Sequence, residues 1–138
     1  MFGVSEAPIF IQGAAEETTI GDIRHRSGFD YQTLEQALIG EESLARWTTL
    51  STVVDEDPDK QTDLRSVTGH INFTDGSSLT WLGSSVVELG KVPVLGQEHI
   101  YVVVGGTGKY FGAEGTLSTS LVDVDNLIFR SVYTLIMK

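Results

Sequence analysis

Side chains that could bind or polarise a small molecule lie on one face of the chain's last β-prone segment. In residues 127–137, alternate positions place Phe129, Ser131 and Tyr133 on the face that carries no charge. A buried tyrosine needs a polar partner, so Tyr133 is either a core residue or a donor to a substrate carbonyl. We therefore name Tyr133 as a catalytic candidate, and Phe129 and Ser131 as substrate-binding candidates.

Further aromatic residues could form the wall of a cavity. Trp81 shares a face with Gly83, whose missing side chain would leave room for a ligand. Trp47 shares a face with Thr49, and Tyr101 shares one with His99. Each aromatic residue is more often part of a core than a ligand contact, so both interpretations stay open. The substrate-binding candidates of this kind are Trp81, Trp47, Tyr101 and Phe73.

Metal, thiol and phosphate-loop chemistry find little support in the sequence. The three histidines, His25, His70 and His99, have no ligand spacing, and the chain has no cysteine. The acidic loop at 55–60 lacks the spacing of a calcium loop. The glycine-rich stretch at 105–115 lacks the Gly-Lys-Ser/Thr of a phosphate loop and is followed by no predicted helix. We predict no metal site.

Length and charge narrow the classes of partner. The 138 residues suit one domain, residues 1–138, with a real core. A net charge of −10 argues against nucleic acid or an anionic membrane surface as partners. No apolar run approaches eighteen residues, and residues 1–6 do not resemble a signal peptide. We expect a cytoplasmic protein.

Short β-prone segments separated by turn signals fill the chain. The 23–45 region is ambiguous: residues 30–38 have a local helical look that ends at 39–41, and a strand should follow. The strongest hairpin signal is Asp75-Gly76. Predicted strands cover residues 7–15, 46–54, 64–74, 78–89, 100–104, a segment after Gly115, and 127–137.

This pattern predicts an all-β fold, an eight-stranded antiparallel β-barrel. Long strands without convincing amphipathic helices must protect their edges, and closure into a barrel does so. Side chains can fill an eight-stranded barrel, or the barrel can hold one small ligand. Function is then expected inside the barrel or at its mouth.

One stretch resembles a known signature. Pro93-Val94, followed by the run 102–115 with its Gly105-Gly106-Thr107-Gly108 core, is similar to the allene oxide cyclase and dirigent barrel superfamily. Looser matches are the hairpin at 72–77 and Ile20-Gly21-Asp22. The resemblance implies an eight-stranded antiparallel barrel, often oligomeric, with a largely apolar cavity and no cofactor.

Departures from the plant members favour another branch. The chain lacks the pocket cysteine of plant allene oxide cyclases, and Lys109 and Glu114 reverse the charges that dirigent proteins carry there. It is closest in kind to bacterial polyketide cyclases of the spirotetronate [4+2] type. Allene oxide cyclases have a substrate-polarising glutamate near the end of their first strand. Glu17, with Glu16 as the alternative, resembles it by position and is our second catalytic candidate.

These observations lead to a functional hypothesis. We expect a cofactor-free cyclase that folds a hydrophobic polyketide-type intermediate for ring closure inside the barrel, acting as a homodimer or homotrimer. The alternative is a binding barrel without catalysis, either a dirigent-like orienting protein or a lipocalin-like carrier. A third interpretation is an interaction domain with a filled core.

Overall fold

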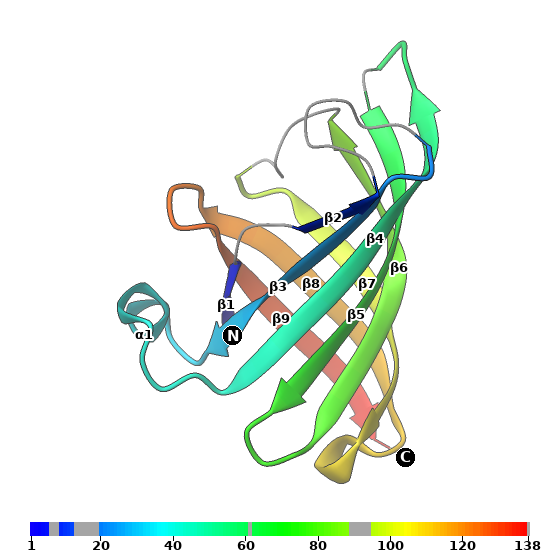
Figure 1. The fold of residues 1–138 in the computed structure, drawn as a ribbon. Coiled ribbons are helices and arrows are strands. Elements are labelled where there is room, and N and C mark those ends of the chain that lie inside the picture. Colours follow the sequence, from blue (N-terminus) through cyan, green and yellow to red (C-terminus); the bar gives the residue numbers. More distant parts are fainter. Residues whose placement is uncertain (6–8, 13–19, 61, 89–94, 138) are drawn as a thin grey trace.

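A computed structural model places one sheet of nine antiparallel strands around a central axis (Figure 1). Residues 6–8, 13–19, 61, 89–94 and 138 lie outside the described part of the chain. The strands are β1 (Phe2–Ser5), β2 (Ile9–Gln12), β3 (Ile23–Tyr31), β4 (Ala45–Asp57), β5 (Thr62–Phe73), β6 (Ser78–Glu88), β7 (Glu98–Thr107), β8 (Ala113–Asp123) and β9 (Ile128–Met137). The helices are α1 (Leu34–Ile39) and the 3-10 helix η1 (Gly108–Tyr110).

The nine strands occupy eight positions of a closed barrel. β1 pairs with β9 on one side and with β3 on the other, which closes the sheet. β2 pairs with an earlier part of the same β3, since Ile9 lies opposite His25 whereas Val4 lies opposite Phe29. β1 and β2 are therefore two pieces of one interrupted barrel strand. The predicted all-β, eight-stranded antiparallel barrel is confirmed.

Most predicted strands are present with shifted ends. Those predicted at 46–54, 64–74, 78–89, 100–104 and 127–137 correspond to β4, β5, β6, β7 and β9. The predicted first strand is Ile9–Gln12 within the described residues, and β1 before it was not expected. The acidic stretch predicted as a loop begins inside β4, because Asp55–Asp57 pair with the start of β5.

The ambiguous 23–45 region holds a long strand and a short helix. Asp30 and Tyr31 belong to the end of β3, so the strand extends further into the helical-looking segment than the sequence suggested. Helix α1 starts at the Thr33 cap, whose side chain accepts a hydrogen bond from Gln36 N–H at 3.1 Å. It ends at Gly40, whose positive φ of 78° favours glycine.

Two hairpin turns close the same end of the barrel. The Asp75-Gly76 turn joins β5 to β6, and the glycine-rich hairpin joins β7 to β8 through η1. A Cβ built on Gly108, which has a φ of 63°, would lie 2.9 Å from the Ser77 side chain. Lys109 and Asp75 form a salt bridge across the two turns at 3.2 Å. We call this the closed end.

Apolar side chains fill the barrel near the closed end. The buried members of this cluster are Ala45, Ile71, Leu79, Trp81, Val103, Ala113 and Leu117. A second, smaller cluster lies outside the barrel, where Ile128 packs with Tyr31 and Ala37 of α1. Ile128 alternates with the inward-facing Phe129 and so points outward from β9, and it is fully buried because α1 covers that position. The space inside the barrel therefore lies on the side away from the two turns.

Candidate functional site

The barrel encloses a cavity of about 130 Å³. Its walls come from inward-facing residues of β1 and of β3 to β9, which alternate with outward-facing residues along each strand. Six of the residues predicted from the sequence line it: Trp47, Trp81, Tyr101, Phe129, Ser131 and Tyr133. Because 150 Å³ is about the size of an engineered cavity that holds benzene, this space suits one ring or a short chain.

Three further predictions concern Phe73, Gly83 and Glu17, which are not among the described residues that line the cavity. Phe73 does not line it, because the end of β5 lies at the closed end, where its ring packs 5.0 Å from that of Tyr110. Gly83 leaves no open volume either, since a Cβ there would meet the Tyr101 ring at 3.0 Å. Glu17, like Glu16, lies outside the described residues, so its role stays a prediction.

Trp81 and Tyr133 form the aromatic part of the cavity nearest the closed end. Their rings meet edge to face, 6.1 Å apart at 72°. Gly69 on the neighbouring strand makes room for this arrangement, because a Cβ built there would lie 2.2 Å from the Trp81 ring. With Trp47 and Leu117, the two rings define what we call the aromatic chamber.

A buried carboxyl group that the sequence pattern did not predict faces the cavity. Asp30 is 2 % exposed, and burial raises the pKa of its carboxyl to about 6. A Cβ built on Gly3 would lie 2.5 Å from Oδ1 of Asp30 and 3.1 Å from Nε1 of Trp47. Both polar atoms therefore border the same small space beside the Gly3 backbone. Within the described residues, the buried Nε1 of Trp47 has no hydrogen-bond partner.

Tyr133 keeps its proton at neutral pH. Burial raises the pKa of its hydroxyl well above the ordinary value, and the charge of Asp30 raises it further. Its O–H is therefore available to donate a hydrogen bond, one of the two roles expected for Tyr133 from the sequence. Asp30, Trp47 and Tyr133 together offer one titratable acid and two neutral donors.

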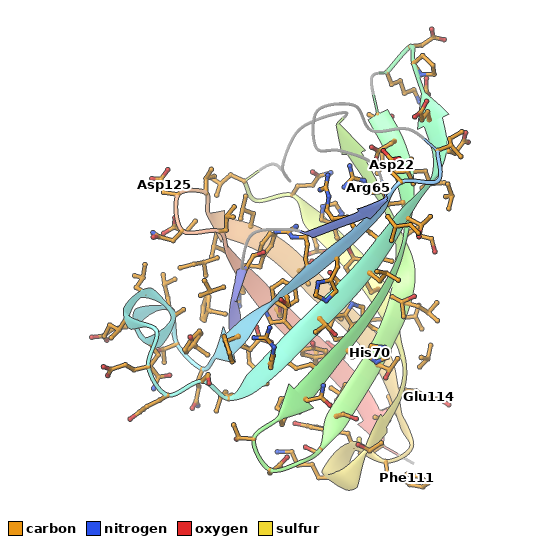
Figure 2. All side chains as sticks on the ribbon, in the orientation of Figure 1. Asp22, Arg65, His70, Phe111, Glu114 and Asp125 are labelled. Atoms are coloured by element: carbon orange, nitrogen blue, oxygen red, sulfur yellow. The ribbon has the colours of Figure 1, made fainter. Side chains whose placement is uncertain are left out.

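The half of the cavity further from the closed end carries charged and polar side chains, although apolar surface predominates over the lining as a whole, as the family resemblance implied. Arg24 and Arg26 of β3 and Arg65 of β5 line it, with Ser85 and His99 nearby along their strands. Figure 2 shows Arg65 in the upper part of the barrel and Phe111 at the opposite end. The alternation of arginines at 24 and 26 was a signal available in the sequence, because residues two apart in a strand share a face.

The histidines do not come together. His99 lines the cavity, and burial lowers the pKa of its imidazole. His70 lies on the outside of β5, with Nδ1 3.0 Å from Oγ1 of Thr80. In the part of the chain that the structure describes, no three His, Cys, Asp or Glu residues are placed to hold a metal ion.

No helix among the described residues is long and apolar enough to cross a membrane.

Fold and cavity together define a small, closed all-β barrel with an internal site. No protein-family model matches the chain, and no curated protein has a significant match to it. A solved structure named pyocyanin demethylase has the same fold, with a TM-score of 0.66 over 97% of this chain and 98% of that chain. The two sequences are 14% identical, so the likeness is one of fold. That neighbour is, by its name, an enzyme.

Proposed function

We propose that this protein is a cofactor-free cyclase that closes a ring in a polyketide-type intermediate bound inside the barrel. The observation that carries the proposal is the grouping of Asp30, Trp47 and Tyr133 around the aromatic chamber. A ring closure of this kind is an isomerisation: new σ bonds form from existing π bonds, and no atom is gained or lost. It needs no external oxidant or reductant.

The geometry supports three contributions to such a reaction. The aromatic walls restrict a flexible chain to a folded conformer, which lowers the entropic part of the barrier. Trp47 N–H and Tyr133 O–H can donate to a substrate carbonyl and stabilise negative charge that develops on its oxygen. Asp30, with a pKa of about 6, can exist in either protonation state near neutral pH and so can accept or donate a proton.

The comparison supports the general class of function. The pyocyanin demethylase structure, by its name, belongs to an enzyme acting on a small molecule, and its fold matches almost all of this chain. We extend from it only the use of this barrel for small-molecule chemistry. The ring-closing reaction and its polyketide substrate class come from the sequence resemblance, and both stay proposals. The cytoplasmic location comes from the sequence pattern alone and is likewise a proposal.

A turnover assay with synthetic substrates tests the proposal. Purified protein is incubated with linear dienes tethered to an electron-poor alkene, and loss of diene absorbance is followed together with product mass. We expect a product of unchanged mass, formed faster than in buffer. Removing one donor in Tyr133→Phe or Trp47→Phe should lower the rate by about 100-fold or more. An exposed change, Thr68→Ala on the outside of β5, serves as the control.

One result would count against a cyclase, and another would count against the site assignment. If dienes bind and the rate equals that in buffer throughout the panel, the protein is a carrier, which was the alternative from the sequence. If turnover occurs and neither Tyr133→Phe nor Trp47→Phe changes it, the site has been assigned to the wrong residues.

A further inference from the structure

The arginines of the cavity stand out against the acidity of the whole chain. The net charge is −10, yet three of the five arginines in the sequence line the interior. Taking a guanidinium out of water is costly unless an anion or strong acceptors compensate for the lost hydration. The positive charges of Arg24, Arg26 and Arg65 therefore need compensation by neighbouring groups or by a ligand.

Arg65 is neutralised within the protein. Its Nε and Nη2 donate to the two carboxylate oxygens of Asp63 at 2.8 and 3.0 Å. Both residues are almost fully buried, and the pairing is bidentate. This pair explains why β5 tolerates two charged residues on its inward face. It leaves little net charge at that position of the cavity.

Arg26 is different, because its described contacts are with neutral groups. Nη2 donates to Oγ of Ser5 at 3.0 Å, and the guanidinium lies over the Phe129 ring, 5.2 Å from its centroid. Its buried Nε has no hydrogen-bond partner, and no described carboxylate forms a salt bridge with it. Burial, with the nearby charge of Arg24, lowers the pKa of Arg26 to about 10, so it stays charged at neutral pH.

The remaining polar groups at this level of the cavity add hydrogen-bonding capacity without negative charge. Ser51, Ser85 and Thr119 contribute hydroxyls, and His99 has a pKa lowered by burial, which favours its neutral form. Asp30 lies four residues further along β3 from Arg26, toward the aromatic chamber. The cavity is thus cationic and polar at one level and aromatic at the other.

We infer that the ligand is a small amphipathic anion, a carboxylic acid whose carboxylate binds Arg26 and whose apolar part enters the aromatic chamber. This inference deepens the proposed function, on which it rests, by naming the charged group that the substrate carries. A carboxylate accepts two hydrogen bonds from a guanidinium in one plane, which fixes orientation as well as affinity. The substrate would then present its reacting atoms to Asp30, Trp47 and Tyr133.

A matched pair of probes tests the inference on the wild-type protein. 4-Phenylbutyrate and 4-phenylbutanol share a ring and chain and differ in the charged group. Both tryptophans of the chain, Trp47 and Trp81, line the cavity, so intrinsic fluorescence reports entry of either probe. We expect the carboxylate to bind at least 10-fold more tightly at low salt, with a smaller advantage in high salt. Equal binding, or tighter binding of the alcohol, would overturn the inference.

Variants identify the responsible arginine. Arg26→Met should weaken 4-phenylbutyrate binding at least 10-fold and leave 4-phenylbutanol unchanged. Arg130→Met removes the same charge from an exposed position on β9 and should change neither. If Arg26→Met binds the carboxylate like wild type, the assignment to Arg26 is wrong. If that variant does not fold, the wild-type probe pair still decides for or against a carboxylate ligand.

These binding results are independent of turnover. If the protein prefers the carboxylate but closes no ring, the inference of an anionic ligand is supported and the proposed cyclase activity is wrong. If the protein converts neutral dienes and binds both probes equally, the proposed cyclase activity is supported and the inference of an anionic ligand is wrong.

Discussion

At the scale of single residues, Asp30 links the stability of the barrel to its chemistry. Its pKa is raised from the ordinary value of 3.8 to about 6, chiefly by burial. The folded state therefore binds this proton more tightly than the unfolded state does. Stability falls as the pH rises from about 4 to about 6 and stays lower above that range. The difference in pKa corresponds to roughly 3 kcal/mol as an upper bound.

Asp30→Asn should accordingly stabilise the protein at neutral pH. An amide of nearly the same shape removes the cost of burying a charge, so we expect a higher Tm than wild type at pH 7.5. At pH 4, where the wild-type carboxyl is protonated, the two proteins should unfold at similar temperatures. Thermal unfolding followed by circular dichroism at both pH values measures this. Identical Tm differences at the two pH values would show that Asp30 does not titrate as described.

The aromatic residues of the site could be predicted from the sequence, and Asp30 could not. Period-two alternation within well-defined strands placed Trp47, Trp81 and Tyr133 inside, and the structure agrees. Asp30 is the first residue of a segment with helical spacing, so the sequence could not predict its face in a strand. Phe73 was misplaced for another reason: alternation gives the face of a strand and not the depth along the barrel.

At the scale of elements, the position of Trp81 depends on the strand beside it. Gly69 of β5 lies opposite Trp81 of β6 in the register, and the indole ring occupies the place where a Cβ would be. A glycine inside a strand normally weakens it, so its presence here reflects the close approach of the ring.

Gly69→Ala should therefore be costly, whereas Gly105→Ala should not. Nothing lies within 4 Å of a Cβ built on Gly105, which is also in a strand. We expect Gly69→Ala to destabilise the fold by about 1–3 kcal/mol through overcrowding and to shift the tryptophan emission spectrum. Urea unfolding followed by fluorescence measures both effects. Equal stability of the two variants would mean that Trp81 moves aside without cost.

Turn chemistry made most of the elements predictable. Asp75-Gly76 was expected to form a hairpin turn, and strands were expected on both sides of the glycine-rich stretch. Both connections are present as hairpins. The interruption between β1 and β2 carried no such signal, because it depends on which part of β3 each piece pairs with. Such long-range register is not encoded in a local pattern.

At the scale of the whole molecule, an apolar area lies on the outside of the barrel. Leu82 of β6 pairs with Val102 of β7, and Ile100 follows on the same outer face. All three are roughly half exposed, and the neighbouring outward positions on β8 are Thr116 and Ser118. We propose that a second copy of the chain covers this uncharged area, which is the homo-oligomer expected from the sequence.

Val102→Lys should separate the copies. A lysine at the centre of an apolar interface introduces an uncompensated charge, so we expect wild type to sediment as an oligomer and the variant as a monomer at micromolar concentration. Thr68→Lys on the outside of β5 is the matched control and should leave the oligomer intact. A monomeric wild type would contradict the proposal for this face.

The apolar cluster at the closed end gives the cavity a floor. In a ligand bound as inferred above, Arg26 fixes the position of the carboxylate, and the floor limits how far the tail can extend. Each methylene added to the tail should then strengthen binding by about 0.8 kcal/mol through burial of apolar surface, until the tail reaches the floor. Longer tails must bend or leave the carboxylate unbound. The barrel would thus select its ligands by length.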